Sequence, residues 1–313
     1  MIDSIDELQV MLAHQRYLLD RDSITVIYLA LRLEKALLLE GPPGAGKTEV
    51  AKVLAQALEL PLVRLQCYEG IDESRALYQW NEPLQRMYLE FLKVESAGTE
   101  REWCKLKHDL YSTDFLIAGP ILRALQSDRK AVLLIDEVDK VGPSFEAFLL
   151  EVLSDFQVSI PQLGTLTPQH RPVVVLTSNA QRKLTDALRG RCFLLWMDYP
   201  TAEREAKIIA ARAAGSQQLL SVQVARFTNA LRHLGMGKPP AIRESLDWIR
   251  ALATLGAEEL SPEVVSLTLP VLLKTRADIE RAAGNVPLLL QRACCSEHKP
   301  TGEPQVTNPQ AVQ

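Results

Sequence analysis

The 313-residue sequence lacks long apolar runs and lacks a surplus of either charge. No apolar stretch reaches the roughly 20 residues that a membrane-spanning helix needs. The first residues, MIDSIDELQVML, carry acids where a secretory signal carries lysine or arginine. These absences predict a cytoplasmic protein with no membrane span. The formal net charge of -4 also gives no bulk basicity, which makes a nucleic-acid partner unlikely.

Cysteine is scarce, and its spacing follows no known framework. The five cysteines are Cys67, Cys104, Cys192, Cys294 and Cys295. Their number is odd and none forms a C-x-x-C pair, so the sequence predicts neither a disulfide framework nor a zinc site. Buried free thiols are the expected state, because unpaired cysteine behaves as a small apolar side chain.

The order of apolar segments predicts an α/β fold followed by a helical one. Five short apolar runs alternate with helical patterns up to residue 200: KALLLE, LPLVRLQ, AVLLID, PVVVLTSN and CFLLWMDYP. Each is expected to be a strand buried on both faces, and strands that alternate with helices form a parallel sheet. The sequence thus predicts an α/β nucleotide-binding domain over residues 1–200.

Beyond residue 200 the strand pattern ends. Helical patterns divided by glycine and Ser-Pro follow in TAEREAKIIAARAAG, LSVQVARFTNALRHLG, AIRESLDWIRALATLG and SPEVVSLTLPVLLKTRADIERAAG. They predict a smaller all-α domain over 201–290. The polar, proline-containing end of the chain has little to bury, so 291–313 is expected to be a disordered tail.

A glycine-rich segment, LLLEGPPGAGKTEV, matches the phosphate-binding pattern G-x-x-x-x-G-K-[ST] between a predicted strand and a predicted helix. Its glycines let backbone amides face phosphate, Lys47 can reach the β and γ phosphates, and the Thr48 hydroxyl can bind Mg²⁺. The candidate ATP-binding residues here are Gly41, Pro42, Pro43, Gly44, Ala45, Gly46, Lys47, Thr48 and Glu49.

Two adjacent acids follow the predicted strand AVLLI. Asp136 is a candidate Mg²⁺ ligand together with Thr48, and Glu137 can polarise an attacking water. A third strand, PVVVLT, ends next to Asn179, whose amide can orient that water. The set predicts hydrolysis of the bound triphosphate.

Three arginines are candidates for contact with the γ phosphate. Arg189 and Arg191 precede the last predicted strand, and either could stabilise the transferring phosphoryl group within the chain or across a subunit boundary. Arg191 is the preferred candidate, with Arg189 sharing or replacing it. Arg243 lies in the first turn of a helix in the predicted helical domain and is a further candidate for ATP binding.

These motifs, in this order, resemble those of AAA+ ATPases. A narrower resemblance to the MoxR family, and within it to CoxD-type members, is carried by CYEGIDESRALYQWN, AGPILRAL, LLIDEVDK, FEAFLLEVLSDFQVSIPQLG and LRGRCFLLWMDYP. The resemblance implies Walker A at 41–48, Walker B at Asp136 and Glu137, sensor 1 at Asn179, the arginine finger at Arg191 and sensor 2 at Arg243.

The resemblance also implies a function. MoxR-type proteins are ring-forming chaperone-like remodellers, usually hexamers, that use ATP and Mg²⁺. They work with a von Willebrand factor A domain protein on a client, often a metalloenzyme that is being matured. Two alternatives stay open: an AAA+ protein serving nucleic acid, of the clamp-loader or helicase type, which the acidic charge disfavours, and a P-loop small-molecule kinase. The kinase is disfavoured by Asn179, Arg191 and Arg243 and by the helical domain.

Two insertions carry the narrower resemblance. DESRALYQWNEPLQRMYLEFLK falls after the second strand, and FQVSIPQLGTLTPQHRP is expected to form a short hairpin. Their aromatic residues Tyr78, Trp80 and Phe156 are candidate partner contacts, with packing into the core as the alternative. The charged segment 93–119 has no assigned role, and a helix is expected over 101–110.

Overall fold

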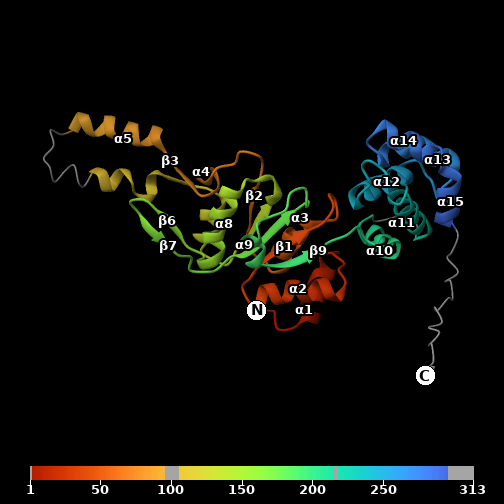
Figure 1. Cartoon of the computed structure of the whole chain (residues 1–313), viewed down its shortest axis with the longest axis horizontal. Helices are drawn as coiled ribbons and strands as arrows, with labels where there is room; N and C mark the ends of the chain where they lie inside the picture. The colour runs from red at the N-terminus through yellow and green to blue at the C-terminus, as the bar shows by residue number, and fades with distance from the viewer. Residues whose placement is uncertain (1, 96–105, 214–217, 295–313) are drawn as a thin grey trace, which may run out of the picture. The chain divides into compact units, whose positions relative to one another are not determined.

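The computed structural model describes residues 2–95, 106–213 and 218–294. The chain divides into two compact units, of which the first contains residues 1–204 and 241–243. The second contains 205–240 and 244–313. Figure 1 labels the elements of both units.

The first unit is built around a parallel sheet. Its five strands are β1 (Ala36–Glu40), β2 (Leu62–Gln66), β5 (Val132–Asp136), β8 (Val173–Ser178) and β9 (Cys192–Trp196). They lie in the order β2-β5-β8-β1-β9, and every pairing is parallel. The predicted α/β fold with a parallel sheet is therefore confirmed.

Burial on both faces was predicted for all five strands and is wrong for two. The inner strands β1 and β5 are buried throughout. β2 and β9 form the edges of the sheet, where Leu194 is 45% exposed and Trp196 52% exposed. An edge strand has a neighbouring strand on one side only and is therefore more exposed. The apolar content of a segment does not show whether its strand lies at the edge or in the centre of the sheet.

Helices cover both faces of this sheet because the strands alternate their side chains. Leu37 and Leu39 of β1 pack with α1 (Ile5–His14), α2 (Arg21–Arg32) and α3 (Lys47–Ala57). Leu38 of β1 belongs to a second apolar cluster, which includes residues of α7 (Pro120–Leu125), α8 (Pro143–Asp155) and α9 (Asp186–Gly190). Two short 3-10 helices, η1 (Thr113–Phe115) and η2 (Val138–Lys140), complete the frame.

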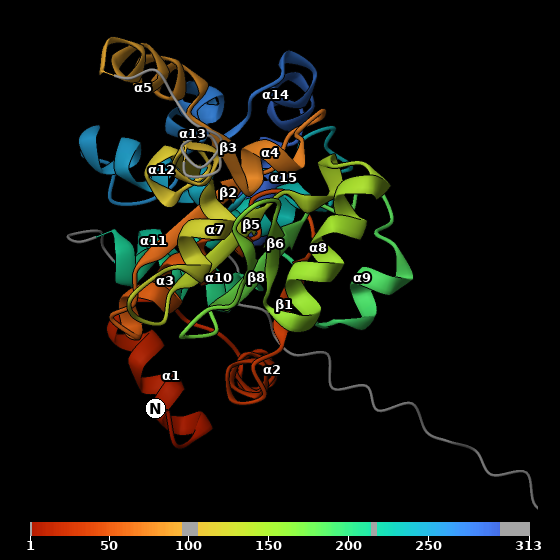
Figure 2. The same ribbon diagram turned by 90° about the vertical axis from the view of Figure 1, so that its left-hand side faces the viewer.

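Both predicted insertions form local structure. The first contains α4 (Glu73–Ala76), β3 (Tyr78–Trp80) and α5 (Glu82–Glu95), and β3 pairs with β4 (Leu116–Ala118). The second is the predicted hairpin, formed by antiparallel β6 (Val158–Ile160) and β7 (Gly164–Leu166). α5 projects away from the central sheet in both Figure 1 and Figure 2.

The structure decides between the two alternatives for Phe156 and shows part of the helix expected over 101–110. Phe156 is only 5% exposed and belongs to the apolar core, so it is not an exposed partner contact. It lies at the end of α8 in the left-handed region, with a φ of 51°. Of the helix expected over 101–110, residues 106–110 are helical and 101–105 lie outside the described part of the chain.

The second unit is helical, and α10 leads into it. Its helices are α10 (Ala202–Arg212), α11 (Gln218–Arg232), α12 (Ile242–Thr254), α13 (Pro262–Leu272), α14 (Arg276–Ala283) and α15 (Val286–Cys294). Phe227 and Trp248 are fully buried, with ring centroids 5.1 Å apart. α15 extends through 291–294, where a disordered tail was expected, and the rest of that tail, 295–313, lies outside the described residues.

The cysteines differ in their environments. Cys67 is buried, as expected, whereas Cys192 is half-buried and Cys294 is exposed, and all three thiols are free. The prediction of buried thiols is wrong for Cys294, because it lies at the end of α15. Cys104 and Cys295 lie outside the described residues. Within the ranges that the structure describes, no helix is both long and apolar enough to cross a membrane.

Candidate nucleotide-binding site

The glycine-rich loop joins the end of β1 to the start of α3, as the motif predicts. Gly44 and Gly46 have positive φ angles, 80° and 95°, which side chains rarely adopt. A Cβ on Gly41 would lie 2.0 Å from the carbonyl oxygen of Met197. The loop backbone therefore requires glycine at these positions, and it ends in the first turn of a helix, where amide groups favour anions.

Lys47 is the first residue of α3 and is buried beneath this loop. Its Nζ donates hydrogen bonds of 2.8 Å to the carbonyl oxygens of Gly41 and Pro42. Burial lowers the pKa of Lys47, and the charges of nearby acids, Asp139 first, oppose that shift. A desolvated ammonium group is thus held beside a backbone that can bind phosphate.

Asp136, at the end of β5, is the centre of a hydrogen-bond network. Its Oδ1 accepts from the Thr48 hydroxyl at 2.9 Å and from the Thr177 hydroxyl at 2.6 Å. Its Oδ2 forms a 2.5 Å ion pair with Arg64 of β2. The fold therefore brings Thr48 and Asp136 together from positions 88 residues apart.

This pair suits Mg²⁺, which prefers oxygen ligands and keeps several non-protein ones. The described residues contain no group of three His, Cys, Asp or Glu side chains able to hold a metal ion. A hydroxyl and a buried carboxylate form a partial ligand set that the oxygens of a phosphate can complete. The donors present therefore fit magnesium that arrives with a nucleotide.

Glu137 follows directly, in the left-handed region with a φ of 60°. Its amide donates to the Thr177 hydroxyl at 2.9 Å. Its Oε2 accepts from Gln66 Nε2 at 3.0 Å and pairs with Lys140 Nζ at 2.6 Å. A hydrogen bond from Lys140 to Glu137, together with the charge of Glu137, raises the pKa of Lys140. The carboxylate is thus oriented by groups from β2 and η2, and the backbone of Glu137 is held by Thr177 of β8.

Asn179 is placed by a buried acid. Asp139 Oδ2 accepts 3.1 Å hydrogen bonds from the backbone amides of Asn179 and Gln181. Asp139 Oδ1 is buried and has no hydrogen-bond partner. The backbone of Asn179 is therefore anchored to η2, the 3-10 helix that follows Glu137.

The candidate arginines have different environments. Arg189 forms a 2.7 Å ion pair with Glu40, a buried residue at the end of β1 just before the glycine-rich loop. Arg191 is exposed and donates to Ser154 Oγ at 2.6 Å and to the Ala187 carbonyl oxygen at 3.1 Å. Neither of these two partners of Arg191 belongs to the group around Asp136.

Arg243 is an exposed residue in the first turn of α12, as the sequence predicts. Its part in ATP binding stays a prediction, as does that of Glu49 in the first turn of α3.

Sequence reasoning missed several polar residues of this site. They are Glu40, Arg64, Gln66, Asp139, Lys140 and Thr177. A signal was present for Arg64 and Gln66, because polar residues near the carboxyl end of one parallel strand meet those of the next. To infer that Arg64 and Gln66 lie near Asp136, one must also know that β2 pairs with β5, which the structure shows.

A parallel sheet with a phosphate-binding loop after one strand and paired acids after another defines a P-loop nucleotide-binding protein. Residues 37–196 match the family described as "ATPase family associated with various cellular activities (AAA)". The chain belongs to this family.

Individual relatives are distant. An uncharacterised protein of Staphylococcus epidermidis is 24% identical over 231 residues, 72% of this chain and 78% of its own length. One of Staphylococcus aureus is 23% identical over 230 residues, 71% of this chain and 77% of its own length. Among solved structures, a mutant of RuvB from Thermotoga maritima is similar with a TM-score of 0.49 and 19% identity, over 86% of this chain and 72% of that one. Cdc6p of Pyrobaculum aerophilum is similar with a TM-score of 0.44 and 16% identity, over 80% of this chain and 65% of that one.

Proposed function

We propose that this chain is a MoxR-type, CoxD-like AAA+ ATPase that hydrolyses ATP in order to remodel a protein partner. The observation that carries the hydrolytic part is the network around Asp136. In this network the Thr48 hydroxyl donates to Asp136. The Thr177 hydroxyl also donates to Asp136 and accepts the backbone amide of Glu137, so it holds the two acids in place. Family membership supports nucleotide binding.

In this proposal each residue has one task. The amides of the loop over 41–48 and the ammonium group of Lys47 bind the phosphates of ATP. Thr48 and Asp136 would hold Mg²⁺, which when bound neutralises charge on the phosphates. Glu137 accepts a proton from the attacking water, and Asn179 orients that water.

The same proposal assigns the arginine finger to Arg191. Arg189 is paired with the buried Glu40, and breaking that pair would leave a buried carboxylate without its partner. Arg191 donates to the side chain of the exposed Ser154 and to a backbone carbonyl oxygen, so it can leave these contacts at lower cost. Arg191 is exposed and does not contact Asp136 or Glu137 of its own chain, which suits an arginine finger that acts on the site of a neighbouring subunit.

The wider function follows from the resemblance to MoxR-type proteins. We propose a homo-oligomeric ring, expected to be a hexamer, located in the cytoplasm. A von Willebrand factor A domain protein would link it to a client complex or metalloenzyme. Arg243 belongs to the first unit but lies in the first turn of α12, whose remaining residues belong to the helical unit. Binding of γ phosphate by Arg243 would therefore connect hydrolysis to movement of α12.

Phosphate release by the purified chain tests the hydrolytic part. Lys47→Ala should lose ATP binding, whereas Glu137→Gln should bind ATP and leave it uncleaved, because the amide cannot accept the proton. Glu258→Gln, an exposed change in the second unit, is the matched control and should behave as the parent. Transfer of phosphate to an acceptor other than water would support a kinase instead, and strong stimulation by DNA would support a nucleic-acid role.

The partner is tested with the same trapping variant. Tagged Glu137→Gln chain is isolated from its native cells in ATP or in ADP, and the bound proteins are identified by mass spectrometry. A von Willebrand factor A domain protein enriched in ATP is the expected result. Its absence beside a reproducible different partner would contradict the MoxR assignment.

A further inference from the structure

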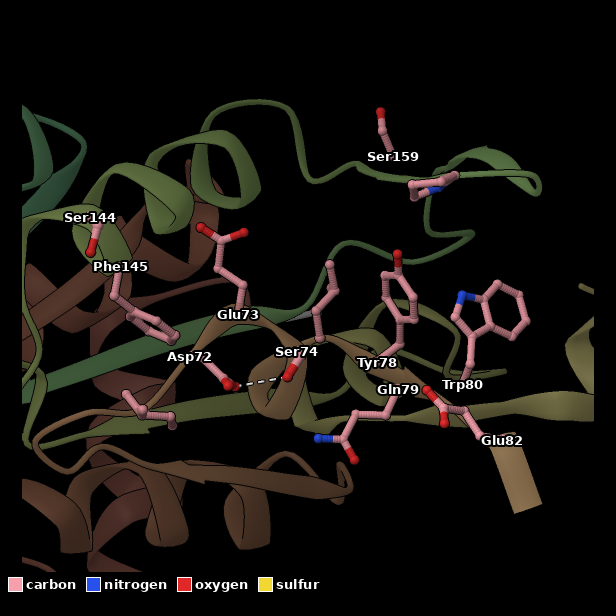
Figure 3. A pocket seen from close by; sticks show the side chains of 13 residues that line it. Asp72, Glu73, Ser74, Tyr78, Gln79, Trp80, Glu82, Ser144, Phe145 and Ser159 are labelled. Carbon is pink, nitrogen blue, oxygen red and sulfur yellow. Dashed lines mark hydrogen bonds between the residues drawn. The ribbon is translucent and has the colours of Figure 1, made fainter. Parts of the chain in front are cut away.

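A groove of about 970 Å³ lies beside the inserted elements, outside the nucleotide site. One side is made by α4 and β3, and the other by the start of α8 and the end of β6 (Figure 3). Ile71, Leu77 and Phe145 contribute apolar surface to it. All of these elements belong to the first unit. The described lining offers both an apolar surface and a polar rim.

The rim is acidic. Asp72, Glu73 and Glu82 line the groove, and its lining contains no lysine, arginine or histidine. The amide of Arg75 and the hydroxyl of Ser74 donate to Asp72 and keep its pKa below the usual value, so Asp72 is charged at neutral pH. Three carboxylates without a lining cation repel anions and attract a cationic ligand.

Nearby cations leave this acidity largely in place. The Arg75 guanidinium donates to the Tyr68 hydroxyl at 2.6 Å, and its positive charge also lowers the pKa of Asp72, so it offsets part of the charge of one of the three carboxylates. Arg86 approaches Glu82 at 3.6 Å, in an exposed pair that is weak in water.

Aromatic rings form another part of the wall. Tyr78 and Trp80 of β3 both line the groove, with ring centroids 5.9 Å apart in an edge-on arrangement. Trp80 also packs edge-on against Tyr111 at 5.2 Å, which restrains the indole. Restrained aromatic faces beside carboxylates are suited to the side chains of lysine and arginine, which bind through cation-π contact as well as charge.

The backbone around the groove also favours an extended ligand. In the part of the chain that the structure describes, β3 pairs only with β4, and β6 pairs only with β7. Each therefore keeps one edge free of strand pairing, and residues of both strands line the groove. A peptide in extended conformation can add to such an edge through main-chain hydrogen bonds.

We propose that this groove binds an extended peptide segment in which lysine or arginine alternates with apolar residues. Charge complementarity selects the basic residues, and the apolar floor selects the others. The proposal rests on the proposed remodelling function and names the chemistry of the segment that the ATPase would take hold of. Nucleic acid is disfavoured, because its phosphates would meet three carboxylates.

Fluorescence anisotropy with defined peptides tests it. A labelled 12-residue peptide of alternating leucine and lysine is compared with one in which glutamate replaces lysine. The full chain should bind the basic peptide, with an affinity that falls as salt rises, and should not bind the acidic one. Glu73→Lys with Glu82→Lys should weaken basic-peptide binding at least about 10-fold and should favour the acidic peptide.

Two further variants keep this result interpretable. Glu258→Lys with Glu259→Lys makes the same change in net charge at exposed positions of the second unit, and it should leave peptide binding unchanged. Glu73→Gln with Glu82→Gln removes charge without reversing it, and it should give an intermediate loss even if the lysine variant folds poorly. Equal binding by all variants would overturn the proposal.

Separate measurements distinguish this proposal from the hydrolytic one. The glutamate variants should keep the parental rate of ATP turnover in the absence of peptide, because neither residue lies at the nucleotide site. If the chain binds peptide through the groove but does not hydrolyse ATP, the proposed ATPase function is rejected and the proposal that the groove binds peptide is retained. A change in oligomeric size on charge reversal, with peptide affinity unchanged, would show that the groove holds a second copy and would overturn the proposal.

Discussion

Thr177 is the residue through which the two acids of the site are connected. Its hydroxyl donates to Asp136 and accepts the amide of Glu137. Thr177→Val keeps the shape but removes both hydrogen bonds, so the proposed Mg²⁺ ligand loses a partner that orients it. The Mg²⁺ concentration for half-maximal turnover should rise about 10-fold or more, while ATP affinity without Mg²⁺ should change little. Thr177→Ser should behave as the parent, and an unchanged Mg²⁺ requirement in the valine variant would contradict the role.

Cys67 and Cys294 should differ sharply in reactivity. Burial, helped by the charges of Asp136 and Glu137, raises the pKa of the Cys67 thiol to about 12. At pH 8.5 fewer than about one in a thousand Cys67 side chains would be thiolate, the nucleophilic form. Iodoacetamide should therefore label the exposed Cys294 and spare Cys67 until guanidinium unfolds the chain. Peptide mass spectrometry would contradict this if both residues were labelled at one rate.

The positions of candidate site residues were predictable where a local motif carries them. Lys47 and Thr48 follow from a contiguous pattern, and Glu137 follows from its place after an apolar strand. Arg64 and Lys140 have no such pattern, because their partners are set by strand order and by a left-handed turn at Glu137. Side chains pair across strands only when the tertiary structure makes those strands neighbours, and a local sequence motif does not show which strands become neighbours.

Among the elements, α10, α11 and α12 are joined by a buried ion pair. Glu205 is 0% exposed, accepts from Arg232 at 2.6 and 2.9 Å, and accepts from the Ser245 hydroxyl at 2.6 Å. Arg232→Met leaves a buried carboxylate without its cation and should cost about 3–5 kcal/mol of unfolding free energy. Chemical denaturation followed by circular dichroism measures it.

Arg250 provides the matched control for that change. It lies on the same unit in an exposed 3.3 Å pair with Asp247. Arg250→Met should cost less than about 1 kcal/mol, since an exposed ion pair contributes little. Equal destabilisation by the two substitutions would show that Glu205 is solvated or protonated and that the pair does not hold the helices together.

Element type was more predictable than element environment. The five strands follow from short apolar runs, and the helices after residue 200 follow from helical patterns. The hairpin at 158–166 was predicted from the insertion FQVSIPQLGTLTPQHRP. The pattern treated 261–284 as one segment, whereas Thr275 caps a separate helix, α14. It also missed α15, which buries Leu289 although its flanking sequence is polar. Edge position and tertiary burial depend on which elements become neighbours.

At the scale of the whole molecule, the chain by itself presents one nucleotide site and an exposed arginine directed to other contacts. Lys47, Asp136 and Glu137 are held within one unit. Arg191 lies at the end of α9 and donates hydrogen bonds to Ser154 of α8 and Ala187 of α9. In the proposed site, an arginine finger whose contacts lie outside the acid group favours catalysis that depends on assembly.

Arg191→Ala should therefore bind ATP normally and hydrolyse it slowly, with a loss of about 10³-fold or more if the arginine acts as a finger. Mixed with Glu137→Gln, whose own site is inactive but whose Arg191 is intact, it should recover part of its turnover. Arg171→Ala, another exposed arginine of the same unit, is the control and should not need rescue. Specific activity of the parent should also rise with protein concentration, since dilution separates subunits. Phosphate release measured over a range of mixing ratios gives the answer: normal turnover in Arg191→Ala rejects the finger, and a slow variant that no partner rescues places the arginine's action within its own chain.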